Sequence, residues 1–395
     1  MANIRKQNKP GSWKITICGG YDPSGKKIRI QRTVNVDPNK TELAQLREVE
    51  KKAAAMETDF ERKLLTAANK ISIKDLAEEY LQDHIVRRGL APRTIESYKD
   101  LIDGKIVPAL GKIHVQDLTP KHINAFYREL EKKDAKGKSL SGTYRLKFHQ
   151  QLHEMLKYAV RTGYISVNPA DMVEAPRRDT KETAFYELDD CSRLLNALDN
   201  LEDTQWRLFF TMSIFTAVRP GELIGLNWSD INGNILTVNA GFVQLRGQKS
   251  MRTDRPKTKK SVRMIDLPPE VTTLLAKHKK EQAAYRLRFG KNWPEPDAVF
   301  TNDLGERLNK YLPSRHWNRF MKKNNLRHIP LYGLRHTAAT LMIAEGLNVR
   351  DVAARLGHAQ TSTTLNIYTH AFMDANSRAT QAISNALAKA KKASF

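Results

Sequence analysis

Two arginines occupy positions where an anion could bind. Arg219, in TAVRPGE, precedes a predicted helix with Pro220 in its first turn, and Arg335, in LYGLRHT, lies just inside the helix that continues HTAATLMIAEG. An arginine beside a helix N-terminus is electrostatically unfavourable, because that end of the helix is already partly positive. A bound anion would offset this cost, so the two arginines predict an anion site. A surface arginine that extends its charge into water is the alternative for either one.

A lysine-rich stretch supplies the next candidates. Lys257 lies in PKTKKSVRMIDLP, where a predicted strand begins, and a lysine from such a basic hairpin can reach a phosphate. For Lys259 or Lys260, protection of a strand edge from pairing with another chain is the better explanation. We therefore take Lys257 as the candidate for chemistry and the other two as candidates for binding.

His358 and Tyr368 stand ten residues apart in RLGHAQTSTTLNIYTH, a stretch of mostly small polar residues. The preceding helix VRDVAARL is predicted to start after an N-cap at Asn348 and to end at Gly357, which leaves His358 just beyond it. Tyr368 would share a face with Leu365 on the short helix that follows. A structural histidine and a core tyrosine are the alternatives when each residue is taken alone.

The charge of the chain indicates what it binds. It contains 66 Lys and Arg against 43 Asp and Glu, a net charge of +23. Residues 1–34 carry eight basic residues against Asp22 alone, and residues 246–263 carry eight against Asp254 alone. This excess indicates a polyanionic partner, with nucleic acid ahead of a membrane surface because the sequence has no basic amphipathic helix with a bulky apolar face. A solvated basic face is the alternative for either run.

The length and the cysteines limit the class of protein. At 395 residues the chain is expected to form about two or three domains. Its longest apolar run, LFFTMSIFTAV from Leu208, is too short to span a bilayer, and MANIRKQNKPGSW lacks the apolar core of a signal peptide. Cys18 and Cys191 provide neither a disulfide framework nor a metal-ligand spacing. The simplest expected compartment is a reducing cytoplasm.

Residues 13–34 predict a β-hairpin, because apolar and polar residues alternate on both sides of a DPSG turn. Its apolar face needs as a partner the helix predicted after Pro38. That face comprises Trp13, Ile15, Ile17, Ile28, Ile30 and Val34. The other face is basic, and a small sheet with such a face can lie in a DNA major groove. Its candidate DNA-binding residues are Lys14, Lys27 and Arg29.

Residues 72–168 predict an all-α domain. Ser72 begins a capping pattern before the helix IKDLAEEYLQDHIVRR, and later helices include RTIESYKDLI, KHINAFYRELEKK and TYRLKFHQQLHEMLKYAVRTG. Arg93, in the first of these later helices, is a candidate DNA contact. After a linker-like stretch, helices such as WRLFFTMSIFTA are interrupted by the hairpin-like NILTVN…QLRG…SVRMIDLP. The last part therefore predicts a mostly helical domain with a small antiparallel sheet.

Together these features resemble the tyrosine recombinase family. The shared pattern is an Arg in TAVRPGE, a Lys in a basic hairpin, an Arg in YGLRHT, then LGH and, ten residues on, a Tyr. The resemblance covers nearly the whole chain, is closest in layout to phage and conjugative-transposon integrases, and implies a multidomain α+β fold. The implied parts are an arm-type DNA-binding domain of three strands and a helix at 1–55, a helical linker at 56–71, a helical core-site DNA-binding domain at 72–168, and a catalytic domain with a C-terminal tail helix at 172–395.

The resemblance also implies a mechanism. Tyr368 would attack a scissile DNA phosphate, leaving a 3′-phosphotyrosyl bond and a free 5′-hydroxyl. Arg219 and Arg335 would neutralise the phosphate oxygens, and Lys257 would protonate the leaving 5′-oxygen. His358 would hydrogen-bond the phosphate or help to move the nucleophile's proton. No metal or other cofactor is implied, because the phosphotyrosine conserves the bond energy for religation.

Two more residues are judged against the family pattern. Glu222 would orient the basic groups. The family usually has a histidine three residues before the second arginine, and this chain has Tyr332 there, which would take that place. His336 is one residue past Arg335, a rotation of about 100° on a helix. The histidine role is therefore transferred neither to His336 nor to His328.

The implied function is that of a site-specific DNA recombinase or integrase that integrates and excises a mobile element in the cytoplasm of a bacterial host. Its partners would be double-stranded DNA at core and arm attachment sites, a homotetramer on synapsed DNA, an excisionase and a DNA-bending host protein. Two alternatives stay open. One is a catalytically weakened DNA-binding regulator on the same scaffold, suggested by Tyr332, and the other is a type IB topoisomerase, which would not need the arm-like sheet.

Overall fold

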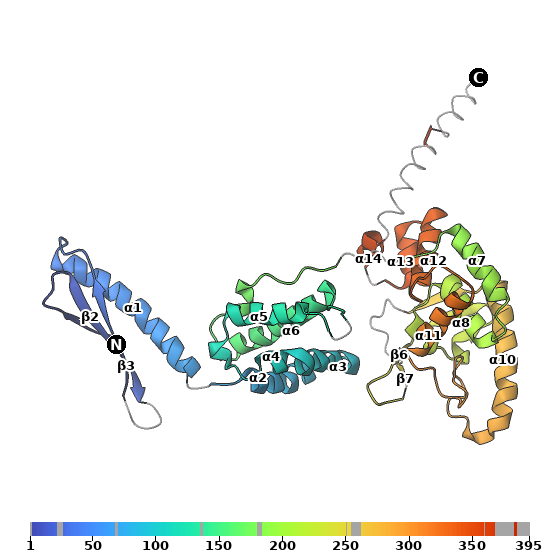
Figure 1. The fold of residues 1–395 in the computed structure, drawn as a ribbon, viewed down its shortest axis with the longest axis horizontal. Helices are drawn as coiled ribbons and strands as arrows, with labels where there is room; N and C mark the ends of the chain where they lie inside the picture. Colours follow the sequence, from blue (N-terminus) through green and yellow to red (C-terminus); the bar gives the residue numbers. More distant parts are fainter. Residues whose placement is uncertain are drawn as a thin grey trace. The chain divides into compact units, whose positions relative to one another are not determined.

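The chain folds into two compact units, Met1–Thr180 and Lys181–Phe395 (Figure 1). Hydrophobic cores form separately in residues 13–53 and 73–173 of the first unit, and in the second unit. The computed structural model describes residues 2–21, 27–67, 70–134, 137–179, 184–249, 251–253, 262–358, 360–367 and 383–384.

The N-terminal part is a three-stranded antiparallel sheet covered by one helix. Trp13, Ile15 and Ile17 of the middle strand are buried in the core that this helix closes. Figure 1 shows the helix lying along the sheet. The predicted antiparallel strand pair and its helical partner are confirmed, while the predicted DPSG turn lies outside the described residues. The elements are β1 (Asn3–Lys6), β2 (Ser12–Tyr21) and β3 (Lys27–Asn35), in the order β1-β2-β3, and α1 (Glu42–Ala67).

The predicted apolar face of this sheet is only partly buried. Ile17 pairs with Ile30 and Trp13 with Val34, so the β3 residues lie on the covered face. Ile30 is nevertheless 36% exposed and Val34 is half-buried. The reason is that β3 is an edge strand, whereas the buried core lies on the middle strand β2. Alternation predicts which face a residue occupies, but not how far a helix covers that face.

Residues 72–168 are helical in the parts that the structure describes, as predicted. The cap at Ser72 is confirmed, since its side chain accepts the backbone N–H of Asp75 at 3.1 Å. Phe148, Leu152 and Leu156 of the longest helix are buried in its core. The elements are α2 (Ile73–Glu79), α3 (Pro92–Leu101), α4 (Val107–Leu110), α5 (Pro120–Glu131) and α6 (Gly142–Arg161), the π-helical turns η1 (Tyr80–Val86) and η2 (Ile102–Ile106), and the 3-10 turns η3 (Val115–Asp117) and η4 (Pro169–Met172).

The second unit is mostly helical and is built around α8, whose residues Leu208, Phe209, Phe210 and Met212 are all buried. Helices α7, α10, α11 and α12 contact α8. The helices are α7 (Leu188–Asp199), α8 (Thr204–Thr216), α9 (Pro220–Ile224), α10 (Pro269–Phe289), α11 (Leu312–Lys323), α12 (Gly333–Ala344), α13 (Val349–Leu356) and α14 (Thr361–Ile367), with 3-10 turns η5 (Trp228–Asp230) and η7 (Gly290–Asn292).

The strands of the second unit form two ladders instead of one hairpin. Val238 pairs with Arg263 in the first ladder, and Gly241 pairs with Thr253 in the second. Each ladder has its own register, which the alternation in the sequence does not specify. The ladders are β4 (Ile231–Asn232), β5 (Ile235–Val238) and β8 (Arg263–Asp266), in the order β4-β5-β8, and β6 (Gly241–Val243) with β7 (Met251–Thr253). The predicted multidomain α+β fold is confirmed.

The predicted tail helix after Tyr368 lies outside the described residues, apart from 383–384. Within the described ranges, no helix combines the length and the apolar character that crossing a membrane requires.

Candidate active site

Arg219 lies in the short connection between α8 and α9. Ala217 ends α8 in the left-handed region at φ 54°, which is uncommon for a residue with a side chain, and Pro220 begins α9. The carboxylate of Glu222 accepts the backbone N–H of Arg219 at 3.0 Å and its Nη1 at 2.8 Å. The side chain of Arg219 is 35% exposed. Its guanidinium is therefore held in one orientation while solvent still reaches it.

Arg335 lies in the first turn of α12 and is only 2% exposed. Its Nη1 donates to the carbonyl of Ala217 at 2.6 Å, and its Nη2 donates to the carbonyl of Leu356 at 2.5 Å. The alternative of a side chain extended into water is therefore wrong for Arg335. Burial, and then repulsion from Arg219, lowers the pKa of Arg335, although a guanidinium stays charged at neutral pH.

Helix α13 ends in a Schellman motif. Gly357 adopts the left-handed conformation at φ 64°, and the carbonyls of Ala353 and Ala354 accept the N–H groups of His358 and Gly357. The predicted helix end at Gly357 is confirmed. These bonds leave the next three carbonyls, of residues 355–357, without backbone partners in the motif.

Three arginine side chains donate to those carbonyls. The C-terminal end of a helix carries partial negative charge, so guanidinium groups are favourable there. The end of α13 thus gathers three cations beside His358. Arg263 Nε donates to the carbonyl of Arg355 at 2.9 Å, Arg335 Nη2 to that of Leu356 at 2.5 Å, and Arg219 Nη2 to that of Gly357 at 3.4 Å.

Glu222 is the carboxylate of this arginine cluster. Burial raises the pKa of Glu222, but hydrogen bonds and charge from Arg263 and Arg219 outweigh burial and hold that pKa below its ordinary value. The structure places Glu222 against Arg219, while its orienting role stays a prediction.

Arg263 was not among the sequence-based candidates. Its Nη2 donates to Glu222 at 2.8 Å, and its side chain is 7% exposed. One signal could have found it: Ile265 in the strand and Leu267 just after it are both buried, and counting back by two places Arg263 on the same inward face. A buried charge of this kind requires a partner of opposite charge.

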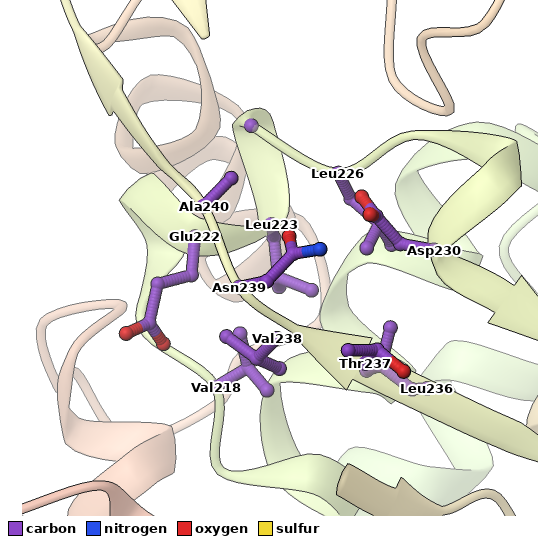
Figure 2. Close-up of a pocket in the computed structure, with 11 residues that line it drawn as sticks. Val218, Glu222, Leu223, Leu226, Asp230, Leu236, Thr237, Val238, Asn239 and Ala240 are labelled. Atoms are coloured by element: carbon purple, nitrogen blue, oxygen red, sulfur yellow. The ribbon is translucent and has the colours of Figure 1, made fainter. Parts of the chain in front are cut away.

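Glu222 and Asp230 lie on opposite sides of a small cavity (Figure 2). The cavity measures about 10 Å³, and its apolar lining includes Val218 and Leu223. A drug-sized ligand needs roughly 300 Å³ or more, so this space is too small for one. Each carboxylate is bound by arginine instead, and Arg252 Nη2 donates to Asp230 at 3.0 Å. The cavity is therefore a small gap in the packing beside the arginine cluster.

His358 connects the arginine cluster to the next helix. Its Nδ1 is hydrogen-bonded to the hydroxyl of Thr364 at 2.7 Å, and Thr364 is buried in α14. Burial, together with the charges of Arg335 and Arg219, lowers the pKa of His358 to about 4. The imidazole is therefore neutral at pH 7. Tyr368 follows α14 directly in the sequence.

Four predicted site residues, Tyr368, Lys257, Lys259 and Lys260, lie outside the described residues. Their proposed roles rest on the sequence and on the described residues that flank them.

Tyr332 directly precedes α12 and is 41% exposed. Its ring makes a T-shaped contact with the ring of His336, with centroids 5.1 Å apart. His336 points away from Arg335, because consecutive residues of a helix face different directions. It lies four positions after Tyr332, and residues at this spacing are neighbours on the helix surface. Burial, and then the charge of Arg335, lowers the pKa of His336 to about 4. His328 is exposed.

Three basic residues of the N-terminal sheet, Arg5, Lys14 and Arg29, lie on its uncovered face, whereas Lys6 pairs with Trp13 and Arg32 pairs with Ile15 on the covered face. Arg5 pairs with Lys14 and Cys18 pairs with Arg29, which places all four on the side opposite Trp13, Ile15 and Ile17. Lys14 is partly exposed, and Arg5 and Arg29 are exposed. Lys27 begins β3.

Arg93, the candidate contact in the helical region, is the second residue of α3. It forms an ion pair with Glu96, and half of its side chain is exposed. A DNA phosphate would have to compete with Glu96 for this guanidinium.

The described residues are suited to hold a phosphoryl group. Arg219 offers a planar fork of donors that solvent can reach, and such forks match the oxygens of a phosphate. The buried charge of Arg335 acts on an anion more strongly than a hydrated charge would. The neutral imidazole of His358 can donate a hydrogen bond or accept a proton.

Comparisons with known proteins agree with the family that the sequence resembles. The phage integrase family model matches residues 185–374, and the model of the phage integrase N-terminal SAM-like domain matches residues 72–130. The ICEBs1 integrase of Bacillus subtilis (strain 168) is 24% identical over 371 residues, which cover 93% of this chain and 95% of that protein.

Two solved structures show the same fold. The Tn1549 transposon integrase in complex with transposon right end DNA matches with a TM-score of 0.64 at 18% identity, covering 80% of this chain and 100% of that chain. A lambda integrase tetramer bound to a Holliday junction matches with a TM-score of 0.56 at 18% identity, covering 91% of this chain and 96% of that chain.

From the family models and the similar sequences, the chain belongs to the tyrosine recombinase (phage integrase) family, and its activity is site-specific DNA recombination.

Proposed function

We propose that this chain cuts and rejoins DNA through a 3′-phosphotyrosyl bond to Tyr368, and thereby integrates and excises a mobile element. The observation that supports this most is the meeting of Arg219, Arg335 and His358 at the end of α13. Thr364 of helix α14 is hydrogen-bonded to His358, and Tyr368 follows α14 directly in the sequence. A tyrosine at this point would enter beside groups suited to hold a phosphate.

The forward step is a phosphoryl transfer to tyrosine. The Tyr368 oxygen attacks phosphorus, the bond to the 5′-oxygen breaks, and Lys257 gives that oxygen a proton. Arg219 and Arg335 act on the charge of the non-bridging oxygens in the transition state. Religation is the reverse reaction, in which a 5′-hydroxyl attacks the phosphotyrosine and Tyr368 leaves.

His358 and Tyr332 would complete the site. Neutral His358 would accept the proton of Tyr368 or donate a hydrogen bond to a non-bridging oxygen. The exposed phenol of Tyr332 would donate a neutral hydrogen bond in the place where the family usually has histidine. Glu222 would keep Arg219 oriented toward the phosphate.

The other parts of the chain would hold the DNA. The uncovered basic face of the N-terminal sheet supports a contact to arm sites, and the exposed half of the Arg93 side chain supports one to core sites. The Tn1549 and lambda integrases of the same fold are bound to DNA. The proposed assignment is arm binding by residues 1–55 with Lys14, Lys27 and Arg29, a linker at 56–71, core binding by residues 72–168, and catalysis by residues 172–395 with Lys259 and Lys260 as further DNA contacts.

Exchange of strands between two duplexes requires cleavage at four positions, so we propose that a homotetramer acts on synapsed DNA. The lambda integrase tetramer on a Holliday junction supports this assembly. An excisionase and a DNA-bending host protein are the further proposed partners, in the cytoplasm of a bacterial host.

The proposal is tested with a core site selected from a random pool of duplexes. A nick placed near the cleavage position releases the 5′-hydroxyl strand, so a cleaved half-site stays attached to the protein. The expected result is a covalent protein–DNA adduct, together with joining of two separate duplexes. Binding with no adduct would identify a regulator instead, and adduct without joining of separate duplexes would identify a topoisomerase.

A further inference from the structure

Arg263 connects three parts of the second unit. It begins β8, its Nε donates to the carbonyl of Arg355 at the end of α13 at 2.9 Å, and its Nη2 donates to Glu222 in α9 at 2.8 Å. Its side chain is 7% exposed, whereas that of Arg219 is 35% exposed. Arg263 is therefore a buried member of the arginine cluster, whereas the guanidinium of Arg219 is open to solvent.

Glu222 is shared between the two arginines. Its Oε1 accepts Nη1 of Arg219 at 2.8 Å and Nη1 of Arg263 at 3.4 Å, and its Oε2 accepts the backbone N–H of Arg219 at 3.0 Å and Nη2 of Arg263 at 2.8 Å. A carboxylate offers about four acceptor sites, so this one is fully used. Its position is fixed from both sides.

We infer that Arg263 is a positioning residue for DNA cleavage. It holds Glu222, and through Glu222 the guanidinium of Arg219, and it also holds the helix end from which His358 extends. The inference rests on the proposed function, because it assigns Arg263 a part in the phosphoryl transfer proposed above. The buried side chain of Arg263 thus fixes the positions of both Arg219 and His358, the two groups that act on the phosphate.

The shape of the guanidinium matters here as well as its charge. Arg263 reaches a carbonyl and both oxygens of a carboxylate at the same time, which a planar fork allows and a lysine ammonium does not. The fit is close on the other side too, because a Cβ on Gly357 would lie 2.8 Å from Nη1 of Arg263. Lysine at position 263 would keep the charge and lose the geometry.

Arg307 provides a matched control. It is also buried, with 6% of the whole residue exposed against 9% for Arg263. It also donates to carbonyls at a helix end, those of Ile224, the last residue of α9, and of Leu226 just beyond it. It also forms an ion pair with a glutamate, Glu295, at 3.1 Å. In the part of the chain that the structure describes, the hydrogen bonds and the ion pair of Arg307 reach neither Arg219, nor Glu222, nor α13.

The test compares Arg263→Lys with Arg307→Lys in the full chain on the nicked core site. At saturating DNA, Arg263→Lys is expected to form adduct about tenfold to a hundredfold more slowly than wild type, with DNA affinity close to wild type, because a small misplacement of a catalytic group has effects of this size. Arg307→Lys is expected to lower the melting temperature and leave the saturated rate close to wild type. A wild-type rate for folded Arg263→Lys, or an equal loss of rate in both variants, would overturn the inference.

A double-mutant cycle separates positioning from a general structural effect. Glu222→Gln and Arg263→Lys should be strongly non-additive in the saturated rate, since both break the same connection to Arg219. Glu222→Gln and Arg307→Lys should be additive. Additive losses for the first pair would show that Arg263 does not act through Glu222.

Where Arg263→Lys does not fold, Glu222→Asp gives the same answer. The shorter carboxylate cannot reach both arginines, so slow adduct formation with retained DNA binding is expected, and a wild-type rate contradicts the inference. The wild-type reaction keeps the two proposals apart. If wild type forms no adduct, the proposed function has failed; if it does and Arg263→Lys matches it, only the positioning role has failed.

Discussion

In the N-terminal sheet, Lys14 and Arg29 lie on the face that α1 leaves uncovered, whereas Arg335 and Arg263 lie inside the second unit. The residues of the sheet belong to an exposed basic surface. The interior arginines donate to main-chain carbonyls at the end of α13, and Arg263 also donates to a carboxylate. The same kind of charge is therefore held in two different ways.

The difference bears on what each group can do. An exposed cation keeps its water and its freedom, so it adds to DNA affinity by displacing counterions but fixes no geometry. A buried guanidinium loses its water, and the carbonyls and the carboxylate offset that loss while they fix its orientation. We therefore expect changes in the sheet to alter binding, and changes in the cluster to alter the rate of cleavage.

The largest effect is expected from Arg335→Lys. A lysine cannot reach both the Ala217 and the Leu356 carbonyl, and it loses the fork that acts on the phosphate. Loss of one such group typically slows a reaction by about a hundredfold to a thousandfold, and we expect a fall of this size in single-turnover cleavage. DNA affinity, measured by gel shift, should change little. Cleavage at the wild-type rate by a folded Arg335→Lys protein would remove the distinction between the two regions.

The next effect concerns the sheet, in the double variant Lys14→Gln, Arg29→Gln. Each phosphate contact contributes about 0.9 to the slope of log affinity against log salt, so the slope for arm DNA should fall by roughly 2. Cleavage of a short core duplex should keep its saturated rate. The control is Lys40→Gln, Lys52→Gln, which removes the same charge from two lysines paired with Glu48. An equal change of slope in both double variants would show that only net charge matters.

A third effect is on stability against pH. The pKa of His336 is about 4 in the folded protein, and the unfolded value is about 6.5. Between these values the unfolded chain binds more protons, so the free energy of unfolding should fall as the pH decreases from 6.5 to 4. Urea unfolding at several pH values should show a shallower fall for His336→Phe than for wild type. An unchanged slope in His336→Phe would show that burial of His336 does not cause this loss of stability.

The smallest effect is expected from Tyr332→Phe. The ring keeps its contact with His336 and loses one neutral hydrogen bond, a change of about 1 kcal/mol or several-fold in cleavage rate. Tyr332→His should be active or faster, with a new acidic shoulder in its pH profile. If Tyr332→Phe cleaves at the wild-type rate, the phenol takes no part in the reaction.

Local features of the sequence predicted the helix ends that surround the site. Asn348 caps α13 by accepting the N–H of Asp351 at 2.9 Å, and Gly357 ends it in the left-handed conformation. Both depend on residues a few positions apart, so the sequence alone could reveal them. The position of His358 just beyond the helix followed from these two residues.

The partners of the arginines could not be predicted in the same way. Arg335 donates to Ala217, 118 positions away, and Arg263 donates to Arg355, 92 positions away. Such bonds depend on how α8, β8 and α13 pack, and no local pattern encodes this packing. The neighbours of Arg263 in the sequence also made its burial hard to predict, because the apolar residues Val262 and Met264 are exposed.

Mapping the adduct decides whether Tyr368 forms the covalent bond to DNA. Wild-type protein is trapped on the nicked core site, digested, and the peptide that carries the nucleotide is identified by mass spectrometry. We expect the nucleotide on Tyr368, and no adduct with Tyr368→Phe, which should still bind the DNA. A nucleotide on another residue, Tyr332 above all, or an adduct that persists in Tyr368→Phe, would contradict the account.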